Sequence, residues 1–200
     1  MRIYVEGLER SGNVYLSYAI SLSTGIETFS RRDHLIETLV HYNGEYPFIV
    51  PVRDAIPSIA SSSIYMKDVV LHDLYNVNGE KDSKIQRLLD RYEKYTDYLV
   101  ENPQFFIAPF HEFTKDHNAV INKITKQYPY IKLKKKITRE DIEELAFSQN
   151  SDVYHTERGN FPRETPKKAE AEEMLKSQYL TEMIKIQSNI DKLYDRYYAL

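Results

Sequence analysis

Four segments of the chain have the length and the hydrophobic pattern of β-strands. Residues 2–6, "RIYVE", alternate apolar and polar side chains, which is typical of a short strand. Residues 47–52, "PFIVPV", and residues 104–110, "QFFIAPF", are nearly continuous apolar runs, as expected for strands buried on both faces of a parallel sheet. Residues 25–29, "GIETF", complete the set. The sequence therefore predicts four short strands.

The stretches between these strands have the apolar spacing of helices. A helix is predicted at residues 13–22, and its expected apolar face carries Val14, Tyr15, Tyr18, Ala19 and Leu22. Further helices are predicted at residues 32–41, 84–102, 114–128 and 138–147. Strands that alternate with helices indicate a parallel sheet. We therefore expect an α/β fold, a three-layer P-loop-type parallel sheet flanked by helices, in a single domain over residues 1–200.

The last third of the chain differs in character from the first part. Residues 148–168 are polar and contain prolines, which predicts a loop or a lid. A long helix is predicted from about Lys167 to residue 198. Its apolar stripe, with steps of three or four residues, consists of Tyr179, Met183, Ile186, Ile190, Leu193 and Tyr197. The stripe is shorter than three heptads, which favours packing on the domain over a coiled coil and leaves a homodimer through this helix open.

Composition narrows the classes of function. The net charge is −3, so the chain lacks the overall positive field that is typical of nucleic-acid-binding proteins. It contains no cysteine, which excludes disulfides, thiolate metal ligands and a cysteine nucleophile. No apolar run approaches the roughly 20 residues that cross a bilayer. We therefore expect a cytoplasmic protein with neither a membrane nor a nucleic acid as partner, and we interpret the lysines among residues 132–136 as a solvated surface run.

The first candidate site follows the first predicted strand. Residues 7–12, "GLERSG", have the two glycines of a phosphate-binding loop, and a predicted helix begins directly after them. Asn13 and Val14 stand where such loops carry Lys and then Ser or Thr, the groups that hold terminal phosphates and Mg²⁺. What remains is a turn of backbone N–H groups at a helix N-terminus, with Arg10 as its cation. The stretch indicates a metal-free phosphate site or a tight connection without a ligand.

The second candidate site follows the predicted strand at residues 47–52. Arg53 and Ser61 lie eight residues apart there, with Asp54 and Ser58 between them. In open α/β sheets, ligands bind outside the carboxyl ends of the strands. This motif therefore places an arginine and a serine at the ligand-binding edge of the sheet.

Together the two motifs resemble those of the sulfotransferase family. The first signature of that family is Lys or Arg followed by Ser-Gly-Thr and usually a second Thr, and it is matched by Arg10, Ser11 and Gly12 but not by Asn13 and Val14. The second signature, in its common "RDPxxSxxS" form, is matched by Arg53, Asp54, Ser58 and Ser61. More loosely, the segment around His111, Glu112 and Phe113 resembles a turn that follows a late strand of the family, so the resemblance covers most of the chain.

The resemblance implies a donor and the residues that bind it. Members of the family transfer a sulfuryl group from 3'-phosphoadenosine 5'-phosphosulfate, generally without a metal. The residues implied to hold the leaving phosphate are Arg10, Ser11, Gly12 and Asn13. Arg53 and Ser61 are implied to hold the 3'-phosphate, and Arg158 and Gly159, in "HTERGN", resemble a loop that closes on it.

Transfer to a hydroxyl or amine of a small molecule or glycan also needs a general base. The family supplies a His or Glu from between its two signatures, where this chain has Glu27, His34 and His41. His34 follows "SRRD" at the start of a predicted helix, and we choose it as the candidate general base. Arg10 is the other candidate catalytic residue. A histidine near a helix start is most often a solvent-facing residue.

Three functions remain open after the sequence is read. The first is a small sulfotransferase-like enzyme. The second is a P-loop phosphotransferase that acts on a nucleotide or small molecule, against which Asn13 and Val14 count. The third is a binding or assembly module that keeps the fold without catalysis.

Overall fold

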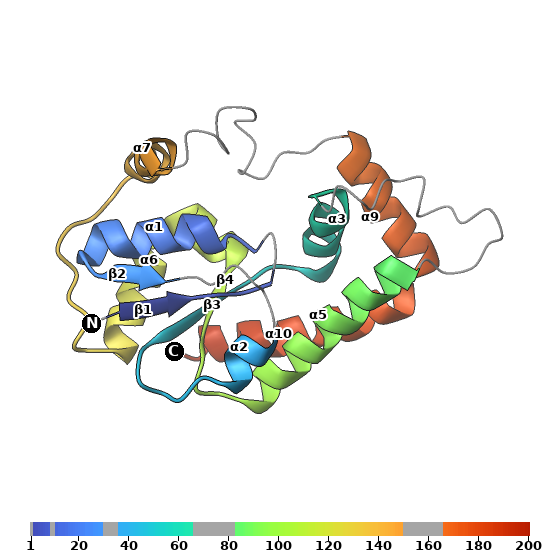
Figure 1. Cartoon of the computed structure of the whole chain (residues 1–200), viewed down its shortest axis with the longest axis horizontal. Helices are drawn as coiled ribbons and strands as arrows, with labels where there is room; N and C mark the ends of the chain where they lie inside the picture. The colour runs from blue at the N-terminus through green and yellow to red at the C-terminus, as the bar shows by residue number, and fades with distance from the viewer. Residues whose placement is uncertain (1, 9–10, 30–35, 66–82, 150–165) are drawn as a thin grey trace.

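One parallel sheet forms the centre of the molecule. The computed structural model describes residues 2–8, 11–29, 36–65, 83–149 and 166–200. Its four strands have the order β2-β1-β3-β4 and are all parallel (Figure 1). They are β1 (Arg2–Val5), β2 (Glu27–Phe29), β3 (Phe48–Val52) and β4 (Phe106–Pro109). The predicted α/β fold with a parallel sheet is thus confirmed.

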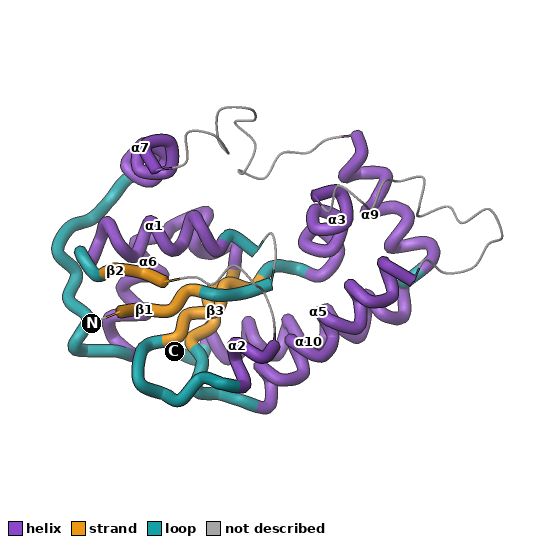
Figure 2. The backbone as a smooth tube through the Cα atoms, viewed as in Figure 1, coloured by secondary structure: helices purple, strands orange, loops and turns teal. Residues whose placement is uncertain are grey.

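Helices cover both faces of the sheet, as the tube view makes plain (Figure 2). They are α1 (Asn13–Thr24), α2 (Ile36–Val40), α3 (Ala55–Tyr65), α5 (Ser83–Glu101), α6 (Phe110–Gln127), α7 (Arg139–Gln149), α9 (Pro166–Gln178) and α10 (Leu180–Tyr198). Alternate residues of β3 enter different cores: Phe48 and Val50 pack with α5 and α10, whereas Ile49 packs with α1 and α6. Burial on both faces explains why β3 and β4 have no polar positions.

The strand order creates a switch point beside β1. The α1 crossover leads from β1 to β2 on one side, and the α2 crossover leads back past β1 to β3 on the other. Helix α1 packs on one face of the sheet, and Leu39 of α2 belongs to the core of the opposite face. In doubly wound sheets, ligands bind outside the carboxyl ends of the strands at such a point. The connections that follow β1 and β3 are therefore the place to look for a site.

Helix α1 presents a different face to the sheet from the one predicted. Leu16, Ala19 and Ile20 are fully buried, whereas Tyr15 and Leu22 are only partly buried. Apolar residues surround most of this helix, so their spacing did not single out one face. Small side chains, which include Ala19, allow the helix to lie close to the strands.

The C-terminal stripe packs inside the chain, as predicted, but it does not belong to one continuous helix. All six of its residues, from Tyr179 to Tyr197, are at most 2% exposed. Tyr179 has φ −129° and ψ 26°, which breaks the predicted helix into α9 and the long α10. Most of the predicted lid, residues 150–165, lies outside the described residues.

Candidate functional site

The connection after β1, residues 6–12, is here called the first loop. Two of its positions require glycine. A Cβ atom on Gly7 would lie 2.3 Å from the carbonyl oxygen of Pro51 in the neighbouring strand. Gly12 has φ +89°, and a Cβ there would lie 2.7 Å from the Phe113 ring. Close approach of the first loop to β3 and α6 thus explains both glycines of the "GLERSG" motif.

The polar side chains of this region bond to the first loop itself. The Ser11 hydroxyl donates to the carbonyl of Leu8 at 2.5 Å, and the Ser11 backbone N–H donates to the same carbonyl at 3.3 Å. The Asn13 amide donates to the carbonyls of Gly7 at 3.0 Å and Leu8 at 3.2 Å. Three donors that the sequence assigned to a phosphate therefore stabilise the turn.

The connection after β3 and the first two turns of α3, residues 53–62, are here called the second loop. The Arg53 guanidinium lies 4.5 Å from the centre of the Phe110 ring. Phe110 is the residue that directly follows β4. The stacking orients a cation at the carboxyl edge of the sheet. The backbone N–H of Ala55 donates to the side-chain oxygen of Gln187 in α10 at 2.9 Å. The Tyr194 hydroxyl, also in α10, donates to the Asp54 carboxylate at 3.1 Å.

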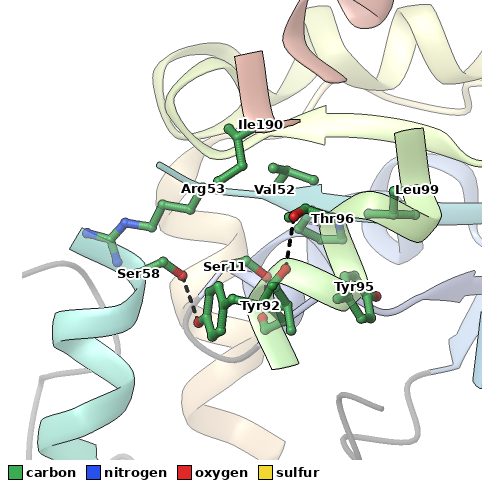
Figure 3. A pocket seen from close by; sticks show the side chains of 11 residues that line it. Ser11, Val52, Arg53, Ser58, Tyr92, Tyr95, Thr96, Leu99 and Ile190 are labelled. Carbon is green, nitrogen blue, oxygen red and sulfur yellow. Dashed lines mark hydrogen bonds between the residues drawn. The ribbon is translucent and has the colours of Figure 1, made fainter. Parts of the chain in front are cut away.

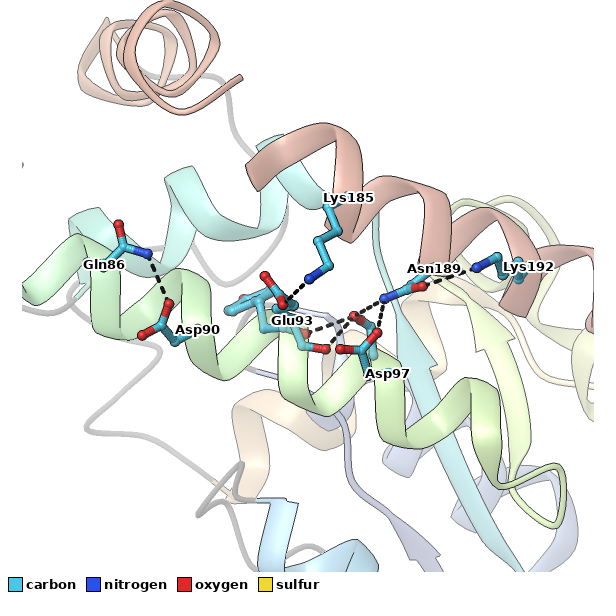
Figure 4. A network of polar contacts seen from close by, with 9 residues as sticks. Gln86, Asp90, Glu93, Asp97, Lys185, Asn189 and Lys192 are labelled. Carbon is cyan, nitrogen blue, oxygen red and sulfur yellow. Dashed lines mark hydrogen bonds and ion pairs between the residues drawn. The ribbon is translucent and has the colours of Figure 1, made fainter. Parts of the chain in front are cut away.

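The same loop is joined to α5 through serine hydroxyls. Ser58 and Ser62 lie one turn apart on α3, and each hydroxyl lies 3.0 Å from the hydroxyl of Tyr92. All three side chains are buried. Helices α5 and α10, which support the second loop, are themselves joined by the Lys185–Glu93 ion pair and by the Asn189 amide, which donates to Asp97 at 2.7 Å (Figure 4).

The first and second loops meet at a small cavity. It is lined by Leu8, Ser11, Pro51, Val52, Arg53, Ser58, Tyr92, Tyr95, Thr96, Leu99 and Ile190. In Figure 3, Ser11 and Ser58 lie beside Tyr92, and the Arg53 side chain extends outward past Ser58. The volume of about 10 Å³ has room for about one water molecule. A nucleotide would have to bind at the mouth, near Arg53, or displace Tyr92.

The structure unites only part of the predicted set. Ser11 and Arg53 line the cavity. Gly12 and Asn13 follow Ser11 directly, at the start of α1. Ser58 also lines the cavity, whereas Ser61, the serine that the sequence assigned to the ligand, does not. Glu27 pairs with Arg2 at 3.5 Å, and both residues lie where strands begin, at the opposite edge of the sheet.

Other predicted residues cannot be placed in this site. His41 is exposed just after α2. The remaining ones, Arg10, His34, Arg158 and Gly159, lie outside the described residues.

Helix α5 contributes residues that the sequence reading did not assign to the site. Tyr92, Tyr95 and Thr96 line the cavity, and the Tyr95 hydroxyl donates to the carbonyl of Glu6 at 3.4 Å. The sequence pattern that could have revealed these residues is the recurrence of hydroxyl-bearing side chains at helical spacing, on the same helix face as Leu88 and Leu99. A buried aliphatic face needs no hydroxyls, so these three indicate polar partners across the interface.

A second polar cluster lies at the end of β4. The imidazole of His111 lies 2.8 Å from the Tyr198 hydroxyl, which donates to the Glu112 carboxylate at 2.9 Å. The His111 ring packs edge-on against Tyr194, with 5.0 Å between ring centres. Burial raises the pKa of Tyr194, and the neighbouring Asp54 carboxylate raises it further. Tyr194 therefore stays a neutral donor to Asp54, and the cluster fastens the end of the chain to the carboxyl edge.

Neither a metal-binding cluster nor a membrane-spanning helix occurs in the described part of the chain. No three His, Asp or Glu side chains among these residues are grouped so that they could hold a metal ion. No helix in the same ranges is both long and apolar enough to cross a lipid bilayer. No family model, curated protein or solved structure matches this chain.

Proposed function

We propose that the chain is a cytoplasmic, sulfotransferase-like enzyme whose donor binds where the first and second loops meet. The observation that supports this proposal is the shared cavity: Ser11 from the first motif lines it together with Arg53 and Ser58 from the second. The cavity lies at the switch point of the sheet, where doubly wound folds bind ligands.

In this proposal the donor is 3'-phosphoadenosine 5'-phosphosulfate and its 3'-phosphate pairs with Arg53. A guanidinium fork can form two parallel hydrogen bonds with a phosphate, and Ser58 or Ser61 can add a third. The sulfuryl group passes to a hydroxyl or amine of a small molecule or glycan as its bond to the 5'-phosphate breaks. The acceptor's proton goes to a base, the role expected of His34.

A non-catalytic binding module is the second candidate, and the bonds of the first loop favour it. The Ser11 hydroxyl and the Asn13 amide already donate to carbonyls of the loop. A loop whose side-chain donors serve its own turn offers fewer of them to a developing charge. In this alternative, the fold is kept for an interaction and no sulfuryl group is transferred.

Titration of the protein with adenosine 3',5'-bisphosphate, with AMP, and with ATP plus Mg²⁺ tests the proposal. Ligand at a hundred times its dissociation constant adds about 2.7 kcal/mol to the free energy of unfolding, which raises the melting temperature by roughly 5 to 10 °C. A rise with the bisphosphate alone is expected. A rise only with ATP and Mg²⁺ would support a phosphotransferase, and no rise with any of the three would favour the binding module.

Two arginine variants sharpen the titration. Arg53→Ala is expected to weaken bisphosphate binding at least about tenfold, because a charge-assisted hydrogen bond contributes about 1.5 to 3 kcal/mol. Arg2→Ala is the matched control, since Arg2 is exposed at the opposite edge of the sheet. Equal affinities for the two variants would remove Arg53 from the site.

A homodimer through the C-terminal helix also remains a proposal. The apolar stripe is buried within the chain, so self-association would have to use Leu180 and Ile184, which are 53% and 61% exposed. These two residues lie one turn apart on the outer side of α10. A concentration-dependent mass that disappears in Ile184→Lys would support the dimer, and a monomer at all concentrations would exclude it.

A further inference from the structure

The segment between α6 and α7, residues 129–137, is here called the strap. Its two ends are fixed by Ile131 and Ile137, which are 1% and 3% exposed. In its middle, the backbone N–H groups of Lys134 and Lys135 donate to the carbonyl of Ser23, near the end of α1, at 2.8 and 3.2 Å. The strap is therefore held by its backbone and by apolar anchors, and its lysine side chains are not needed to keep it in place.

The lysines of the strap lack ion-pair partners in the described part of the chain. Lys132, Lys134, Lys135 and Lys136 are all exposed, and none of them has a carboxylate within 4.0 Å among the described residues. Two of the adjoining acidic residues of α7 have hydrogen-bond or ion-pair partners close to them in sequence. Asp141 accepts hydrogen bonds from Thr138, and Glu143 pairs with Arg139 at 2.9 Å. The hydrogen bonds from Thr138 lower the pKa of Asp141, and the nearby charge of Lys135 lowers it further.

Two apolar side chains accompany these charges. Tyr130 is 55% exposed and Leu133 is 36% exposed, so both reach solvent beside the lysines. An aromatic side chain with a polar tip suits the headgroup level of a bilayer, and a leucine suits its acyl boundary. A polybasic patch is attracted to anionic lipids, and apolar side chains beside it can bury surface at the headgroup level, so the two contributions to membrane binding add.

The position of the strap leaves the candidate site accessible. In Figure 1 it runs along the outer edge of the molecule, near the N-terminus and at the amino ends of the strands. The first and second loops follow the carboxyl ends of β1 and β3. A flat surface that met the strap would therefore lie at the edge of the sheet opposite the cavity.

We propose that the strap docks the protein on an anionic lipid surface. Lysines near such a surface each contribute to attraction, and the negative lipids of the cytoplasmic leaflet supply the charge. Salt screens charges that lie more than about 8 Å apart. The attraction to the lipid surface therefore depends on the charges of the strap and its neighbours, and not on the net charge of −3. A nucleic acid is favoured less, because Leu133 has no counterpart on a phosphate backbone and the strap lacks arginine. The proposal does not depend on the function proposed for the cavity.

Flotation with lipid vesicles tests this inference. The full chain is expected to float with vesicles of phosphatidylcholine and phosphatidylserine and to stay behind with phosphatidylcholine alone. The triple variant Lys132→Gln, Lys135→Gln and Lys136→Gln is expected to bind about 100-fold more weakly. It leaves Lys134 unchanged, because the Lys134 side chain lies over Gly25 at the end of α1.

The matched control removes three lysines elsewhere. Lys94, Lys167 and Lys176 are exposed on α5 and α9, and changing them to Gln alters the net charge equally. This control is expected to float like the original chain. Leu133→Ser is a separate variant that leaves the charge unchanged, and it is expected to float less than the original chain.

Three outcomes would overturn the inference. These are no flotation with the anionic vesicles, equal losses in the strap and control variants, and tighter binding to a single-stranded oligothymidine than to the vesicles at equal salt. The last outcome would assign the strap to a nucleic acid.

Discussion

The first and second loops meet at one cavity, but they are stabilised in different ways. The first loop is closed by its own sequence neighbours: the Ser11 hydroxyl and the Asn13 amide both donate to the carbonyl of Leu8. The second loop depends on distant helices, because Gln187 of α10 accepts from Ala55 and Tyr92 of α5 lies against Ser58. One side of the candidate site is therefore determined locally, and the other by the tertiary fold.

This difference predicts how each loop responds to change. The turn from Leu8 to Asn13 should be sensitive to its own residues and should respond little to α10, whereas α5 reaches the first loop only at Glu6, whose carbonyl accepts a hydrogen bond from Tyr95 among the contacts of the described residues. A loop held by distant helices should change when those helices do, even though they follow it in sequence by many residues. Variants that separate these two behaviours would test the comparison.

The largest effect is expected at Gly12. Gly12→Ala forces a Cβ into the left-handed region at φ +89° and to 2.7 Å from the Phe113 ring. The backbone term costs about 1 to 2 kcal/mol and the crowding a similar amount, so the free energy of unfolding should fall by about 3 kcal/mol. Urea unfolding measures it.

Gly44→Ala is the control, because Gly44 has φ +79° and nothing within 4 Å of a Cβ. Its loss should be only about 1 kcal/mol, the backbone term alone. Equal losses at the two glycines would show that contact with α6 does not constrain the first loop.

The next effect is expected at Tyr92, in the support of the second loop. Tyr92→Phe removes a buried hydroxyl that lies 3.0 Å from both Ser58 and Ser62. Loss of buried hydrogen bonds should lower the free energy of unfolding by about 1.5 kcal/mol. Tyr98→Phe on the same helix is the control, since the Tyr98 ring packs on Phe105 and is only partly buried. A change at Tyr98 as large as at Tyr92 would mean that the hydroxyl pair does not matter.

The same distinction explains how much the sequence could predict. The strands and most helices followed from local spacing, and the glycines of the first loop marked a turn that does exist. The partners of the second loop could not be predicted, because nothing near Ala55 or Ser58 indicates Gln187 or Tyr92. Asn13 was read as a ligand donor, although its amide can also close the turn, as it does here.

Two errors in the helices have a similar cause. The predicted C-terminal helix breaks at Tyr179, but apolar residues keep helical spacing on both sides and no Gly or Pro stands at the break. The face of α1 was misjudged because Tyr15 is only partly buried and stacks on Phe113 of α6, whereas Leu16, Ala19 and Ile20 are the fully buried residues. Tertiary packing determines both the break at Tyr179 and the buried face of α1. The periodicity of apolar residues alone does not predict such packing.

A smaller effect is expected at Gln187. Gln187→Ala leaves the Ala55 N–H at the start of α3 without its acceptor, which is comparable to losing a helix cap. The free energy of unfolding should fall by about 1 kcal/mol, and the amide of Ala55 should exchange its hydrogen faster. Ser188→Ala, at an exposed neighbouring position, should leave the exchange of that amide unchanged. Unaltered exchange in Gln187→Ala would remove α10 from the support of the second loop.

The smallest expected effect is a coupling between the loops, and it addresses the comparison directly. Asn13→Ala opens the first loop, and Gln187→Ala loosens the second. If the loops are stabilised independently, the decrease in the free energy of unfolding of the double variant should equal the sum of the decreases in the single variants to within about 0.5 kcal/mol. The pair Ser58→Ala and Tyr92→Phe is the positive control, because these groups touch and should couple by at least about 0.5 kcal/mol. Coupling of that size between Asn13 and Gln187 would instead show that the cavity joins the two loops into one cooperative unit.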